Sequence, residues 1–155
     1  MFFQLLAGAF ISFVNFGLHA MMTGLIVMAT NHTAERTDHL HVFGRVAALM
    51  TVTVTALMVA HAVEIAVWAL FYAAAGVPVP VSEFEFAFEN YTALGYGDAI
   101  AGGDWRLIGP ITALNGLLLI GWSVAIIFEV MRMAEVQVIR LEDRPNRRRT
   151  PKPRT

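Results

Sequence analysis

The chain contains no cysteine among its 155 residues, which excludes disulfide scaffolds, thiolate metal sites and cysteine nucleophiles. Charge is also scarce, since charged residues make up only 15% of the chain while hydrophobic residues make up 57%. A soluble globule of this length has too much surface to hide so many apolar side chains. The composition therefore predicts a membrane protein.

Positive charge is missing from the first part of the chain and concentrated at its end. The first basic residue is Arg36, and seven of the eleven Lys and Arg residues lie at or after Arg140. This distribution excludes a soluble enzyme, a disordered chain and a compact nucleic-acid binder with one basic face. The chain also shows no nucleophile or cofactor motif, so we expect neither an enzyme nor a nucleic-acid partner.

Three apolar runs, 2–30, 46–75 and 107–128, are long enough to cross a bilayer. At about 1.5 Å per residue, each helix would span the roughly 30 Å hydrocarbon core. The first run has no basic N-terminal region and is longer than the apolar part of a secretory signal, so we interpret it as a retained helix. Because an unpaired strand would leave its backbone unsatisfied in lipid, we predict an all-α membrane protein with three transmembrane helices.

The orientation follows from the charged segments between the spans. Basic segments stay in the cytoplasm, and with three spans the connection holding Arg36 and Arg45 lies on the same side as the tail from Arg140. The acidic segment 76–106 and the N-terminus then lie outside. We predict a multi-pass protein of the cell (inner) membrane with a cytoplasmic C-terminus.

The outer segment 76–106 contains a short helix of its own. Ser82 followed by Glu85 forms a capping box, and aromatic residues then recur at helical spacing, which predicts a helix over 83–92. The following Gly95-Tyr96-Gly97-Asp98 would by itself indicate an ordinary turn. Between two spans, however, a loop can dip into the membrane where protein or a water-filled pathway surrounds it.

This segment resembles a known family. Residues 92–98, Thr-Ala-Leu-Gly-Tyr-Gly-Asp, are similar to the selectivity filter of the potassium-channel pore domain, whose usual core is Thr-Val-Gly-Tyr-Gly-Asp. The resemblance covers about 46–135 and implies an outer helix (46–75), a pore helix (83–92), a filter (93–98) and an inner helix (107–134). It leaves out the N-terminal helix and loop (1–45) and the basic tail (136–155). We expect the tail to be disordered and to attract anionic lipid headgroups.

The resemblance implies a subunit that conducts potassium passively. In such filters, rings of backbone carbonyls replace the water shell of the ion, and glycine permits the left-handed backbone that turns the carbonyls to one axis. By resemblance, K+ is bound by the carbonyls of Ala93, Leu94, Gly95 and Tyr96, within a filter made of Thr92, Ala93, Leu94, Gly95, Tyr96 and Gly97. One chain supplies one loop, so the ring implies a homotetramer. We expect K+ ions in the filter and no organic cofactor.

One filter position departs from the family pattern. The family usually has Thr where this chain has Ala93, and that hydroxyl helps to form the innermost ion site. Its loss leaves carbonyls only at that site, although Thr92 stands just before it. Two alternatives therefore stay open beside the selective channel: a weakly selective cation channel, and a non-conducting membrane subunit that uses the pore fold to bind a partner.

The resemblance also implies residues that support the filter. Glu89 lies nine residues before Asp98, matching a carboxyl pair that in some family members holds the back of the filter. The alternative is that Glu89 faces water in the outer vestibule. Phe86 stands where the family often places an aromatic residue that packs around the filter tyrosine, here Tyr96.

The inner helix contains Asn115, Gly116 and Gly121. The two glycines lie near the place where the family often has a hinge, but they would equally permit close helix packing. Asn115 would either line the cavity or hydrogen-bond to a neighbouring helix.

The first two spans carry ionisable and polar residues at membrane depth, where they are costly and usually face protein. Asn15 and His19 share one face of the first span, and His61 and Glu64 share a face of the second. Antiparallel packing predicts Asn15 level with His61 and Ser12 near Glu64, within about one turn, in a polar seam that docks the first helix onto the pore domain. Its role would be hydrogen-bonded adhesion, a proton-sensitive gate because histidine titrates near neutral pH, or a metal site.

Overall fold

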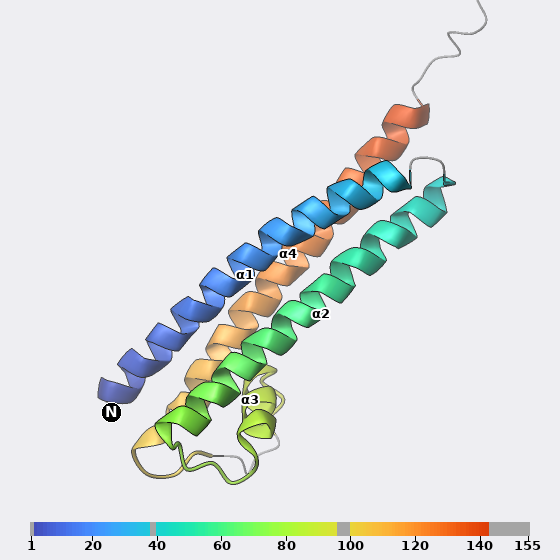
Figure 1. Cartoon of the computed structure of the whole chain (residues 1–155). Helices are drawn as coiled ribbons and strands as arrows, with labels where there is room; N and C mark the ends of the chain where they lie inside the picture. The colour runs from blue at the N-terminus through green and yellow to red at the C-terminus, as the bar shows by residue number, and fades with distance from the viewer. Residues whose placement is uncertain (1, 38–39, 96–99, 143–155) are drawn as a thin grey trace, which may run out of the picture.

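The computed structural model of the protein describes residues 2–37, 40–95 and 100–142. Three long helices lie side by side (Figure 1): α1 (Phe2–Arg36), α2 (Val42–Ala75) and α4 (Ile108–Glu142). A short helix, α3 (Glu83–Tyr91), and a 3-10 turn, η1 (Gly103–Trp105), lie between α2 and α4 in the chain. The described ranges contain no strand, which confirms the all-α fold.

Each of the three long helices is long and apolar enough to cross a bilayer. The N-terminus and α3 lie at one end of the bundle, and the α1–α2 connection lies at the other end together with the last turns of α4 (Figure 1). Both α1 and α3 contact α2 and α4. The chain is therefore a multi-pass membrane protein in which the short helix is inserted at one end of the bundle.

Local signals in the sequence set the ends of α2 and α3. Helix α2 ends at Gly76, which adopts the left-handed conformation with φ 60° and donates its N–H to the carbonyl of Ala73 at 3.3 Å. Helix α3 begins after Ser82, whose hydroxyl accepts the N–H of Glu85 at 3.3 Å, as the capping box predicts. This cap fixes where the short helix enters the bundle.

Several helix ends differ from the prediction. Helix α1 runs on to Arg36, so the loop predicted within 1–45 shrinks to a short connection before α2, which begins four residues earlier than expected. Helix α4 continues to Glu142, which contradicts disorder for residues 136–142 of the predicted tail. The reason is that no helix-breaking Gly or Pro occurs between Gly121 and Pro145. Residues 143–155 lie outside the described ranges.

Two buried clusters hold the helices together. One surrounds α3 and includes Trp68, Tyr72, Phe86, Tyr91 and Leu119. The second lies towards the α1–α2 connection and joins α1, α2 and α4 through residues such as Ile26, Leu57 and Val130. Because lipid tails are as apolar as these side chains, van der Waals packing rather than water exclusion provides the contact energy here.

Candidate functional site

The C-terminal end of α3 is packed tightly against α4. Tyr91, the last residue of α3, is buried, and a Cβ atom added to Gly116 would lie only 1.9 Å from the carbonyl oxygen of Tyr91. Gly116 is therefore a place where α3 closely approaches α4, which favours the packing interpretation over a hinge. At Gly121 an added Cβ would meet nothing within 4 Å, and α4 continues unbroken through both glycines.

The chain leaves α3 through a Schellman motif, a common C-cap in which the left-handed residue is usually glycine. The N–H of Leu94 bonds to the carbonyl of Glu89 at 3.1 Å, and the N–H of Ala93 bonds to the carbonyl of Asn90 at 2.9 Å. Ala93 takes the left-handed position with φ 54°. This conformation costs an L-residue about 1–2 kcal/mol, so the start of the predicted filter carries strain.

The first half of the predicted filter lies within the described residues. Gly95 has φ 55°, so residues 93 and 95 are both left-handed, with Leu94 between them. The hydroxyl of Thr92 is engaged by α3, since it donates to the carbonyl of Phe88 at 2.9 Å. Tyr96, Gly97 and Asp98 lie outside the described residues, and the predicted contacts of this second half are therefore not placed.

The two predicted support residues of α3 are both packed. Phe86 is fully buried, and its ring lies 5.2 Å from that of Tyr72, centroid to centroid. Glu89 is half-buried and lines a cavity of about 800 Å³ beside Ala93 and Gly95. One Glu89 carboxylate oxygen is buried with no hydrogen-bond partner in the described part of the chain. Their expected partners, Tyr96 and Asp98, belong to the undescribed segment.

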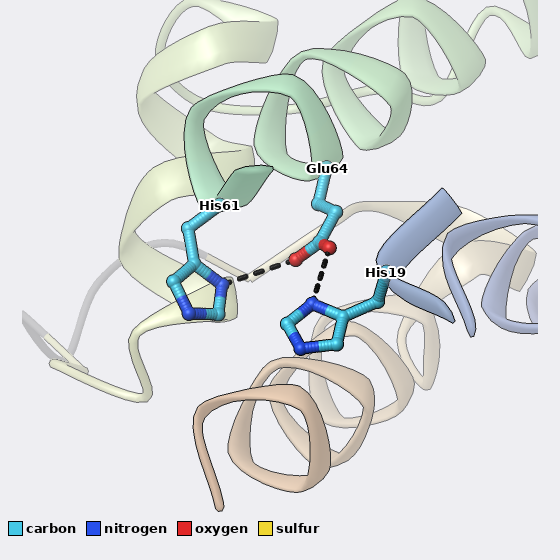
Figure 2. A group of neighbouring side chains, drawn as sticks. All are labelled: His19, His61 and Glu64. Atoms are coloured by element: carbon cyan, nitrogen blue, oxygen red, sulfur yellow. Dashed lines mark hydrogen bonds and ion pairs between the residues drawn. The ribbon is translucent and has the colours of Figure 1, made fainter. Parts of the chain in front are cut away.

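A buried cluster made of His19, His61, Glu64 and Tyr91 lies where α1, α2 and α3 meet. One carboxylate oxygen of Glu64 lies 2.8 Å from Nδ1 of His19, and the other lies 3.0 Å from Nδ1 of His61 (Figure 2). The Tyr91 hydroxyl donates a hydrogen bond to Glu64 and lies 2.8 Å from the same His61 nitrogen. His19 and Glu64 are each only 1% exposed. The structure thus brings together three residues of the predicted seam and adds the pore helix.

The fourth seam residue, Asn15, joins this cluster to α4. Its amide nitrogen donates to the backbone carbonyl of Glu64 and to the side-chain oxygen of Asn115, both at 3.2 Å. The indole N–H of Trp68 donates to the same Asn115 oxygen at 2.9 Å. Asn115 therefore bonds to neighbouring helices. Asn15 lies level with Glu64, three residues from His61, which agrees with the predicted register within about one helical turn.

Three members of the polar network are not predicted from the sequence: Trp68, Tyr91 and Ser123. Tyr91 was counted only for its aromatic spacing, although its hydroxyl reaches Glu64. Ser123 lies 2.9 Å from Nε2 of His61. A signal for Ser123 exists, because it follows Asn115 at helical spacing and shares the buried face of α4.

These features define the class of protein: a multi-pass, all-α membrane protein whose short helix ends buried between the outer and inner helices. Residues 58–133 match the model of the family described as "Ion channel", which supports a potassium-channel pore domain of the two-transmembrane type over this segment. The matched segment covers most of α2, all of α3 and most of α4, but not α1. Comparisons with curated proteins and with solved structures gave no match.

Proposed function

We propose that the chain is the subunit of a homotetrameric, potassium-selective channel that conducts K+ passively down its gradient. The match of residues 58–133 to the ion-channel family supports an ion channel. Four copies are proposed because each chain supplies one filter loop, and members of this family usually assemble as oligomers.

The observation that carries this proposal is the geometry at the end of α3. The helix ends buried at Tyr91, and the backbone then turns left-handed at Ala93 and Gly95. The carbonyl end of a helix carries a partial negative charge that favours a cation, and rings of backbone carbonyls strip and bind such an ion. We assign K+ binding to the carbonyls of Ala93, Leu94, Gly95 and Tyr96, with Thr92 and Gly97 completing the filter.

The orientation and surroundings complete the proposal. The end of the bundle that holds α3 and the N-terminus faces outside. The opposite end, which holds the basic residues, lies on the cytoplasmic side of the cell membrane. Exposed apolar residues of α4, such as Leu114 and Phe128, then meet lipid or neighbouring subunits. The basic tail contacts anionic headgroups.

The test is the reversal potential of the purified protein in planar bilayers, with a potassium gradient opposed by a sodium gradient. We expect a reversal close to the potassium equilibrium potential. Gly95→Ala should abolish the current or make it irregular, because a residue with a side chain is strained at a φ of 55°. The matched control is Gly17→Ala on α1, where an added Cβ meets nothing within 4 Å.

A second candidate is a weakly selective cation channel, which is favoured by the absence of a hydroxyl at Ala93. It predicts a reversal near zero under the same opposed gradients. The absence of any current from a confirmed tetramer would reject both channel proposals in favour of a non-conducting membrane subunit.

A further inference from the structure

The buried cluster contains three side chains whose donor atoms converge on one point. We propose that His19, His61 and Glu64 form a binding site for a divalent transition metal ion of the Zn²⁺ type, which fastens α1 to the pore segment. This inference concerns metal binding alone, so it stands or falls independently of the proposed conduction.

The donor atoms are already gathered at close to metal-binding distances. One nitrogen from each imidazole and one carboxylate oxygen of Glu64 lie within 4.8 Å of one another. Figure 2 shows both rings directed at the carboxylate from two different helices. Two histidines and a glutamate form a known zinc ligand set, and metal–ligand bonds of about 2.0–2.2 Å separate neighbouring tetrahedral ligands by about 3.3 Å. The two imidazole nitrogens lie 2.8 and 3.0 Å from different oxygens of the Glu64 carboxylate. On metal binding these contacts would open by a few tenths of an ångström, and any donor pair near the 4.8 Å limit would close towards about 3.3 Å.

An independent observation is the partner behind His61. A metal-binding histidine usually bonds through its second ring nitrogen to another group, which fixes the ring and its tautomer. His61 directs Nδ1 towards Glu64 and holds Nε2 2.9 Å from the hydroxyl of Ser123 on α4. With the proton on Nε2 donated to Ser123, Nδ1 offers a free electron pair to the metal.

The hydroxyl of Tyr91 offers an oxygen as a fourth donor beside these ligands. It contacts Glu64 and lies 2.8 Å from Nδ1 of His61. A Zn²⁺ ion beside one glutamate leaves one uncompensated positive charge, which is costly in a low-dielectric interior. If Tyr91 binds as the phenolate and releases its proton to solvent, the charges of metal, Glu64 and Tyr91 sum to zero.

The position of the ligands also fits a metal site. His19 and Glu64 are enclosed, whereas the His61 side chain is 20% exposed. His19 lies on α1, outside the segment 58–133 that matches the channel family, while the other two ligands lie within it. The metal would therefore join the additional helix to α2 and to the last residue of the pore helix, two positions before Ala93.

The experiment is a Co²⁺ titration of the full-length protein, purified without a polyhistidine tag and stripped of metal by a chelator. Four-coordinate Co²⁺ absorbs visible light, so binding and geometry are observed together. We expect saturation at one Co²⁺ per subunit and displacement by Zn²⁺. His19→Gln and His61→Gln should each weaken binding at least tenfold, and Ser123→Ala by about tenfold.

The matched controls are His32→Gln and His41→Gln, which remove exposed histidines near the α1–α2 connection and should leave the titration unchanged. Circular dichroism and elution volume verify that each variant is folded. If His19→Gln does not fold, His61→Gln and Tyr91→Phe provide the same test. The ring of His61 is partly exposed, and Tyr91→Phe removes only one oxygen atom. No saturable absorption in the wild type, or binding by the folded ligand variants as tight as that of the wild type, would overturn the proposal.

Discussion

The carbonyl of Tyr91 lies against Gly116 so closely that no side chain fits between them, since an added Cβ would lie 1.9 Å from the carbonyl oxygen. This contact joins the end of α3 to the first third of α4 through backbone atoms. Movement of one helix is therefore transmitted directly to the other, without a flexible side chain between them.

Gly116→Ala should destabilise the protein by more than the 1–3 kcal/mol typical of overpacking, because backbone rather than a flexible side chain must move. Gly121→Ala, with open space around it, should be neutral or stabilising by up to about 1 kcal/mol, since alanine favours helix over glycine. Thermal unfolding in detergent measures both variants. Equal effects of the two substitutions would contradict the close approach.

Ala93 offers a test of backbone strain at the start of the predicted filter. Ala93→Gly should stabilise the metal-free protein by about 1 kcal/mol, because glycine adopts φ 54° without strain. Ala93→Thr, which restores the family residue, should destabilise it, because a β-branched side chain is disfavoured at positive φ. Unfolding measurements on the two variants and the wild type give these changes in stability. A Thr variant as stable as the wild type would show that residue 93 is not left-handed.

Glu64 should be far more sensitive to substitution than an exposed glutamate. Glu64→Gln replaces the carboxylate that two histidines and a tyrosine contact, and leaving buried donors without their acceptor costs about 1–3 kcal/mol. Glu129→Gln is the matched control: Glu129 pairs with Arg132 at 2.6 Å but both side chains are exposed, so a negligible change is expected. The measurement is thermal unfolding of metal-free protein, and similar shifts for both variants would contradict the buried hydrogen bonds of Glu64.

Asn115 should stabilise the protein through its hydrogen-bond partners on α1 and α2. Asn115→Ala leaves the buried indole N–H of Trp68 and the amide of Asn15 without their shared acceptor, at about 1–3 kcal/mol for a buried donor. Fluorescence of Trp68, measured in a variant where Trp105 and Trp122 are phenylalanine, should change on the substitution. The adjacent exposed Leu114→Ala provides the comparison, and should leave both emission and stability nearly unchanged.

The sequence predicted the helices and their polar faces well, because both depend on local patterns. Run length revealed the three spans, and Ser82 marked the start of α3. Side-chain partners were harder to predict, because they depend on how each helix is rotated and shifted against the others. Asn15 and Asn115 are separated by 100 residues and meet only because α1 packs on both α2 and α4.

The left-handed conformation of Ala93 could not be predicted from its residue type, since alanine is not a favoured residue there. The Schellman hydrogen bonds to Asn90 and Glu89 impose it. The resemblance to the family indicates only that residue 93 lacks the threonine hydroxyl. The structure shows a backbone conformation at this residue in which the usual threonine would itself be strained.

The contact of α1 with Glu64 has a consequence for how the chain enters the membrane. A carboxylate at this depth is costly in lipid. Helix α1 places the imidazole of His19 against it, and the amide of Asn15 bonds to the backbone carbonyl of the same residue. Since α1 is synthesised first, it is already in the bilayer when α2 arrives. The first helix thus serves Glu64 as water serves a carboxylate on a soluble protein: it is a solvation shell carried within the same polypeptide.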